Sequence, residues 1–166
     1  EGTADRAFRL VVGDTIGLTP PMGWTSYNLW GDQITQKRML ETAKAMVSTG
    51  LIDHGWTYVN MDDGWQGARG GTLHALQPNP RRFPDMKGMI DDIHAMGLKV
   101  GIYSSPWVMT YAGRVGGSAE NPEGTVQQWP PRVPKNRKQL PFAIGKYTFF
   151  TNDAEQFAQS GIDYLK

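Results

Sequence analysis

The chain contains two kinds of hydrophobic pattern, one with helical spacing and one of short continuous apolar runs. Helical spacing covers residues 35–48 and 85–96, and a third, shorter helix is expected after Asn152. The first stripe contains Met39, Ala43, Met46 and Val47, and the second contains Met86, Met89, Ile90, Ile93 and Met96. These stripes predict amphipathic helices that cover a buried core.

The ends of the predicted helices carry residues that favour caps. Thr35 and Asp85 stand where an N-cap side chain can accept a backbone hydrogen bond. Asn152 and Glu155 have the spacing of a capping box, with Phe157 and Ala158 on the inner face of that helix. Each helix is expected to end at a glycine, because glycine adopts a left-handed cap at little cost. These glycines are Gly50, Gly97 and Gly161.

Apolar runs after these glycines predict strands at 56–61, 98–103 and 162–166, and residues 22–24 predict an earlier strand. A weaker alternation of apolar and polar residues at 7–12 predicts a short strand near the N-terminus. Strands that alternate with helices predict an α/β fold with a parallel sheet. Four strands and three helices suit a flavodoxin-like sheet or the first half of a (β/α)8 barrel, which takes about 250 residues in all.

Composition excludes several other classes of protein. The 166 residues are 39% hydrophobic with net charge +1, which is typical of a globular chain and not of an electrostatic nucleic-acid binder. No apolar run is long enough to cross a membrane, and there is no cysteine. His54, His74 and His94 lack metal-ligand spacing, so no metal or cofactor is predicted.

The carboxyl ends of the strands carry the candidate chemistry, because ligands of parallel α/β folds bind there. Asp62 and Asp63 follow the second strand directly, with Gly64 and Trp65 next. The two carboxylates could hold neighbouring sugar hydroxyls, ligate a hard cation, or act as a cap and a solvated side chain. Trp65 favours the sugar, because an aromatic face complements a pyranose ring.

Five motifs in the correct order resemble the α-galactosidases of glycoside hydrolase family 27, the melibiase group. They are Thr19–Asn28, Tyr58–Gln66, Pro80–Lys87, Gly97–Tyr103 and Gly161–Lys166. The resemblance implies the N-terminal half of a (β/α)8 barrel over residues 18–166, containing strands one to four. Residues 1–17 then form an N-terminal strand and linker.

The resemblance also assigns site residues in a retaining exo-glycosidase that acts on terminal α-galactosides. It implies that Asp62 and Asp63 hold the 4- and 6-hydroxyls of galactose, and that Tyr103 lines the pocket. It implies that Lys166 contacts the sugar, and that Tyr27 stacks where the family usually has Trp. With Trp65, these residues form the predicted substrate site.

Some features depart from the family pattern. Cysteine pairs are absent, and Tyr111–Gly113 occupies a stretch where one such Cys is common. The segment Ser104–Phe150 is long and resembles that of a bacterial subgroup, for which we expect extracellular or periplasmic export. Related activities on α-N-acetylgalactosaminides or β-L-arabinopyranosides stay open. A non-catalytic carbohydrate-binding module of the same ancestry stays open as well.

We predict that the 166-residue chain alone does not hydrolyse glycosides. In the family the nucleophilic Asp lies two residues after the strand-four Lys, here Lys166, and the acid/base Asp lies on strand six. Covalent catalysis would therefore lack its nucleophile. We also expect the isolated chain to self-associate through exposed strand edges. Turnover of an aryl α-galactoside by the purified chain, or a monodisperse and cooperatively melting monomer, would contradict these expectations.

Overall fold

The computed structural model describes residues 21–125 and 143–166. The predicted strand at 7–12 and the proposed N-terminal segment 1–17 lie outside the described residues. Part of the long segment 104–150 lies outside them too.

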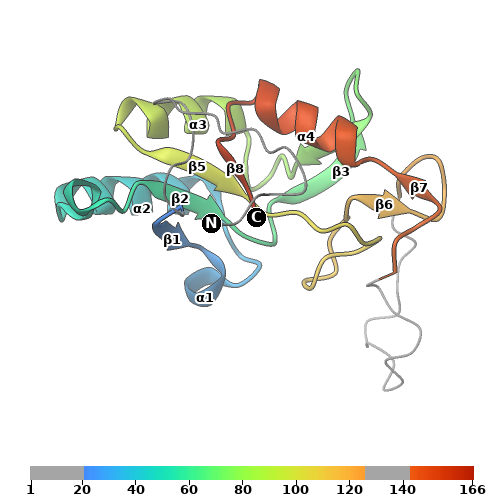
Figure 1. Ribbon diagram of the computed structural model, residues 1–166, viewed down its shortest axis with the longest axis horizontal. Coiled ribbons are helices and arrows are strands. Elements are labelled where there is room, and N and C mark those ends of the chain that lie inside the picture. The colour runs from blue at the N-terminus through green and yellow to red at the C-terminus, as the bar shows by residue number, and fades with distance from the viewer. Residues whose placement is uncertain (1–20, 126–142) are drawn as a thin grey trace, which may run out of the picture.

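A four-stranded parallel sheet forms the centre of the fold (Figure 1). Its strands are β1 (Gly23–Thr25), β2 (Tyr58–Met61), β5 (Lys99–Ile102) and β8 (Tyr164–Leu165), in the order β1-β2-β5-β8. All four predicted strands are therefore present, and neighbours in the sheet follow the order of the chain. Right-handed crossovers in one direction place the connecting helices on one face, as in a segment of a (β/α)8 barrel.

Three longer helices run alongside this sheet in Figure 1. They are α2 (Gln36–Ser48), α3 (Met86–Ala95) and α4 (Phe150–Gln159). Shorter helical turns are α1 (Tyr27–Trp30) and the 3-10 helix η1 (Leu51–His54). The predicted caps are confirmed at two helices, where the side chains of Thr35 and Asp85 accept from the backbone N–H of Arg38 and Gly88. The apolar stripes of α2 and α3 enter one core with β2 and β5.

The predicted capping box on the third helix is wrong. Helix α4 begins at Phe150, and the Asn152 side chain donates instead to the Leu73 carbonyl at 2.7 Å. Phe157 is buried as expected, but Ala158 is exposed, and so is Val47 on α2. Tertiary contacts determine both the start of α4 and the face that it buries.

Two small antiparallel strand pairs, which the sequence did not predict, lie beyond the carboxyl ends of the sheet strands (Figure 1). The first joins β3 (Gln66–Gly70) to β4 (Ala75–Pro78). The second pairs β6 (Ser118–Ala119) with β7 (Tyr147–Thr148). Both strand pairs extend the protein around the edge where the candidate residues lie.

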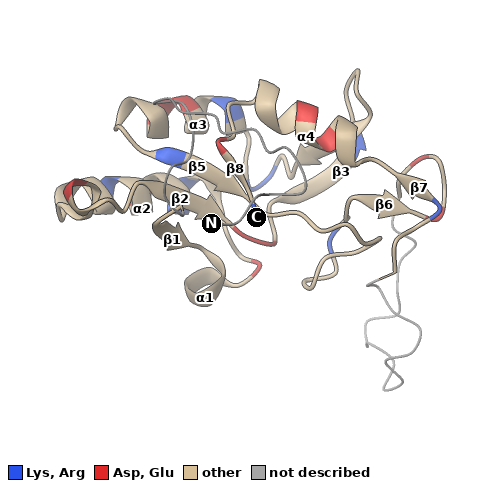
Figure 2. Ribbon diagram, in the orientation of Figure 1, with Lys and Arg blue, Asp and Glu red and all other residues tan. Residues whose placement is uncertain are grey.

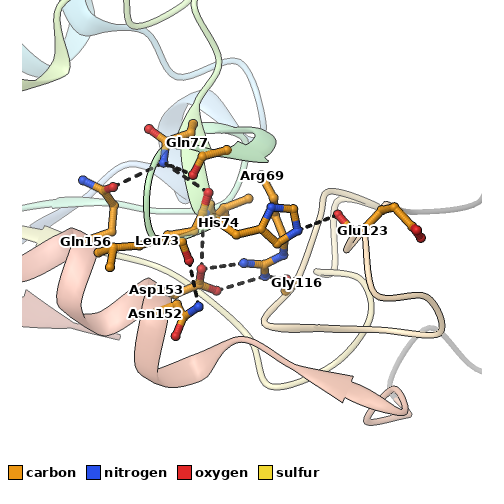
Figure 3. A network of polar contacts seen from close by, with 12 residues as sticks. Arg69, Leu73, His74, Gln77, Gly116, Glu123, Asn152, Asp153 and Gln156 are labelled. Atoms are coloured by element: carbon orange, nitrogen blue, oxygen red, sulfur yellow. Dashed lines mark hydrogen bonds and ion pairs between the residues drawn. The ribbon is translucent and has the colours of Figure 1, made fainter.

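A buried ion pair connects the β3–β4 hairpin to α4 (Figure 3). Arg69 on β3 donates to both carboxylate oxygens of Asp153 at 2.5 and 2.9 Å, and to the Gly116 carbonyl at 2.5 Å. Asp153 also accepts from the Leu76 backbone N–H at 2.9 Å. The Arg69 guanidinium lies 4.1 Å from the centre of the Phe149 ring. One residue from β3 therefore contacts two segments that are distant in the sequence, the loop at Gly116 and the start of α4.

Surface charge is mixed in sign along α2 and α3 (Figure 2). Exposed i,i+4 pairs on these helices include Lys37 with Glu41 and Lys87 with Asp91. Among the described residues, the search for a helix of sufficient length and apolarity to span a membrane found none.

Loss of the buried pair is expected to be costly. Asp153→Ala leaves the Arg69 guanidinium buried without its carboxylate, and we expect unfolding of the complete enzyme in urea to require about 3–5 kcal/mol less free energy. Lys87→Ala, which removes one partner of an exposed pair on α3, serves as the control and should change stability by less than about 0.5 kcal/mol. Equal effects of the two substitutions would contradict the role given to Arg69 and Asp153.

Candidate functional site

A cleft of about 600 Å³ lies at the carboxyl edge of the sheet. Residues that follow all four strands line it: Thr25, Tyr27, Asn28, Asp62, Asp63, Tyr103, Tyr111 and Lys166. Five of the six predicted site residues are thus brought together, although they span almost the whole described chain. The carboxyl ends of neighbouring parallel strands meet at one edge, which explains this convergence.

Asp62 is held on three sides. Its backbone N–H donates to the hydroxyl of the buried Ser26 at 2.9 Å. One carboxylate oxygen accepts from the Asp63 backbone N–H at 2.8 Å, and the other accepts from Lys166 Nζ at 2.6 Å. The carboxylate is therefore fixed and paired with a cation. It retains lone pairs that can accept from a ligand.

Asp63 is more deeply buried, with only 1% of the residue exposed. Its carboxylate oxygens accept from the Thr110 hydroxyl and from the Ala112 backbone N–H, each at 2.7 Å. Burial raises the pKa of Asp63, because the charged form loses solvent, and these two hydrogen bonds oppose the rise. The negative charge of Asp62 adds a smaller upward contribution to the pKa.

The loop that carries Thr110 has its own anchors. The Thr110 hydroxyl accepts from the Arg114 backbone N–H at 3.0 Å, so its hydrogen is directed to Asp63. The Arg114 side chain pairs with Asp32 at 2.5 Å. A hydrogen bond from Gln33, together with Arg114 and Arg82, lowers the pKa of Asp32. The charged state of Asp32 thus supports the loop that orients Asp63.

Gly64 allows the two adjacent carboxylates to face the same cleft. Its φ of +111° lies in the region that favours glycine, and a Cβ built there would lie 2.4 Å from the Asp32 carbonyl oxygen. Adjacent side chains of a regular strand point to opposite faces. The turn at Gly64 takes the chain out of the regular strand, so that both carboxylates line one cleft.

Two tyrosines flank the carboxylates. Tyr103 follows β5, and burial, with the negative charges of Asp63 and Asp62, raises its pKa to about 12. Its hydroxyl therefore stays protonated and can donate. Tyr27 at the start of α1 is 41% exposed and lies on the other side of the Asp pair in strand order.

Trp65 does not line the cleft, which corrects its predicted role as a sugar platform. The residue is 1% exposed and contacts Phe157 edge to face, with ring centroids 5.6 Å apart. Its indole N–H donates to the Tyr103 carbonyl at 2.8 Å. The ring is a core element behind the site, and its faces are covered by protein.

The surroundings of the Asp pair do not match its interpretation as a cap and a solvated side chain. Both carboxylates are buried, so neither is a solvated side chain, and neither caps a helix. In residues 21–125 and 143–166, no group of three His, Asp or Glu side chains is arranged to hold a metal ion. His74 and His94 instead contact the Glu123 carbonyl and the Asp163 carboxylate.

Thr110, Tyr111, Ala112 and Asn28 were not predicted as site residues. Three of them lie in the long segment after β5, which has no regular hydrophobic period. Gly113, with φ +73°, marks a turn there. Nothing in the sequence indicated that this turn would fold back onto Asp63.

The family model described as alpha galactosidase A, of the melibiase group, matches residues 19–130. The chain belongs to this family. It is 38% identical over 154 residues to a probable alpha-galactosidase of Dictyostelium discoideum, a match that covers 91% of this chain and 32% of that protein. The chain spans about a third of the length of the curated relatives it matches.

Solved structures of the family share the fold. Alpha-galactosidase I of Mortierella vinacea has a TM-score of 0.69 and 32% identity, over 93% of this chain and 32% of that chain. A Saccharomyces cerevisiae alpha-galactosidase, solved with raffinose, has a TM-score of 0.68 and 27% identity, over 93% of this chain and 28% of that one. The four-stranded sheet is therefore part of a (β/α)8 barrel. The resemblance to a bacterial subgroup stays a prediction.

Removal of the Asp63 charge is expected to change the pH dependence of stability. Because its folded pKa is raised, the folded state holds more protons than the unfolded chain above the unfolded value of about 3.9. This contribution lowers the free energy of unfolding as pH rises from the unfolded pKa of Asp63 to its folded pKa. We expect Asp63→Asn to gain stability relative to wild type from pH 4 to pH 7, measured as urea midpoints.

Asp92→Asn, on the exposed face of α3, is the control for this experiment. Its stability difference from wild type should not change across the same range. A difference between Asp63→Asn and wild type that shrinks as pH rises would contradict the raised pKa.

Proposed function

We propose that this chain forms the sugar-binding part of a retaining exo-glycosidase that acts on terminal α-galactosides. The observation that carries the proposal is the pair of fixed, buried carboxylates that share one cleft with Lys166 and Tyr103. Family membership supports the assignment to the galactosidases.

The arrangement suits a ligand that presents several neighbouring hydroxyls. Asp62 and Asp63 offer acceptors, while Lys166 Nζ and the protonated Tyr103 hydroxyl offer donors. Hydrogen bonds from a hydroxyl to a carboxylate are short and about twice as strong as neutral ones. Because protein donors already orient both carboxylates, a sugar would meet acceptors that need no rearrangement.

The same contacts make a nucleophilic role for Asp62 or Asp63 unsuitable. A retaining glycosidase places its nucleophile and its acid/base about 5–5.5 Å apart, on either side of the glycosidic bond. Asp63 is restrained by the loop at Thr110 and Ala112, and Asp62 is neutralised by Lys166. We assign both to substrate binding, and place the nucleophile two positions after Lys166 and the acid/base on a later strand, as the resemblance implies.

The proposal extends to the arrangement of the barrel and to the substrate. Residues 18–166 provide its first four strands. The yeast relative solved with raffinose supports a substrate in which α-linked galactose is the terminal sugar. Glycosides of N-acetylgalactosamine and of arabinopyranose are the comparison substrates for the assay.

Substitution of Asp62 tests this function in the complete enzyme. Asp62→Asn removes a charged acceptor and leaves a substrate hydroxyl poorly paired. We expect kcat/KM for an aryl α-galactoside to fall by about 100-fold or more, because loss of a buried charged hydrogen bond costs roughly 3 kcal/mol.

The exposed Asp92→Asn should keep the activity of the wild-type enzyme. Wild-type kinetics in Asp62→Asn would reject the binding role. Galactose binding without any hydrolysis by the complete wild-type protein would favour a carbohydrate-binding module instead.

A further inference from the structure

Tyr111 is an aromatic residue at the cleft that the family resemblance did not assign. It is 70% exposed, whereas Asp62 and Asp63 in the same cleft are 6% and 1% exposed. The carboxylates therefore form the floor of the cleft, and Tyr111 stands at its mouth. A side chain with this exposure fills no gap in the core, so we expect its replacement to leave the fold unchanged.

The backbone on both sides of Tyr111 is tied to the floor. Thr110 donates through its hydroxyl to one oxygen of Asp63, and Ala112 donates through its N–H to the other. The turn is closed by hydrogen bonds from the Thr110 N–H to the Arg114 carbonyl, at 2.9 Å, and from the Gly113 N–H to the Thr110 carbonyl, at 3.0 Å. The position of Tyr111 relative to Asp63 is therefore fixed, because the residue before Tyr111 and the residue after it both donate to Asp63.

The ring of Tyr111 is also oriented. It meets the Trp107 ring edge to face, with centroids 5.6 Å apart and an interplanar angle of 87°. Aromatic pairs of this geometry contribute about 0.5–1.5 kcal/mol beyond their buried area. An exposed ring held by its neighbour offers a rigid, amphipathic surface that loses little entropy on binding.

The size of the cleft leaves room beyond one sugar. Its volume of about 600 Å³ lies well within the range of roughly 300–1,000 Å³ that suits drug-sized ligands. A terminal galactose bound to Asp62 and Asp63 would occupy the floor. The rest of an oligosaccharide must leave through the mouth, where Tyr111 stands.

Resting on the proposed function, we propose that Tyr111 forms a binding platform for the second sugar ring of the substrate, on the leaving-group side of the bond that is cleaved. Its ring packs on the apolar face of that pyranose, and its hydroxyl lies at the solvent edge. Tyr111 thereby favours oligosaccharides over simple galactosides without contacting the terminal galactose.

The test compares raffinose with free galactose in the complete enzyme. In Tyr111→Ala, KM for raffinose should rise roughly 3- to 10-fold, the effect expected for one aromatic contact, with kcat little changed. The inhibition constant of galactose should stay at its wild-type value. Tyr111→Phe keeps the ring and should restore most of the raffinose affinity.

Trp56→Ala is the matched control, because Trp56 is an aromatic residue with 41% exposure that does not line the cleft. Trp56→Ala should change neither the KM for raffinose nor the inhibition constant of galactose. Equal weakening of galactose and raffinose in Tyr111→Ala would overturn the proposal, because Tyr111 would then contact the terminal sugar. Unchanged constants for both would overturn it as well. A wild-type enzyme that binds neither sugar would instead overturn the proposed function, and the platform with it.

Discussion

A buried pair of opposite charges, Arg69 and Asp153, joins the segments that surround the cleft. Arg69 comes from the β3–β4 hairpin, Asp153 comes from α4, and the Gly116 carbonyl that Arg69 also contacts comes from the long segment after β5. Burial of two charges costs solvation, which their attraction offsets only when the geometry is good. Such a pair is weak evidence for net stability. Its clearer effect is geometric, because few other arrangements of these segments satisfy both charges.

The geometry set by this pair reaches the site through the loop between Trp107 and Gly116. Arg69 fixes one end of that loop, and the contact of Arg114 with Asp32 fixes it from the opposite side. Just before these anchors in the chain, the loop donates two hydrogen bonds to Asp63, from Thr110 and Ala112. A buried carboxylate without donors would take up a proton. The two hydrogen bonds from the loop oppose the rise in the Asp63 pKa that burial causes, and so favour the charged carboxylate, which is the form that binds a sugar hydroxyl strongly.

The sequence was sufficient for the elements whose signals are local. The stripes of α2 and α3, the caps at Thr35 and Asp85 and the strands of the sheet depend on neighbours a few residues away. The Asp pair was found because strand ends of a parallel sheet converge. Asn152, Trp65 and Thr110 were misjudged or missed, because each is placed by a partner 38 to 79 residues away. No periodicity or capping rule carries information over such distances.

The ion pair between Lys166 and Asp62 has a consequence for the order of assembly. Its partners are separated by 104 positions, and Lys166 reaches Asp62 only after β8 has joined β5. Contacts between such distant residues form late, because closing a long loop costs entropy before any contact offsets it. The Ser26, Thr110 and Ala112 contacts to the Asp pair can precede it. The ion pair in the cleft is therefore a marker that β2, β5 and β8 have paired, and binding that depends on Lys166 reports only molecules in which these three strands have assembled.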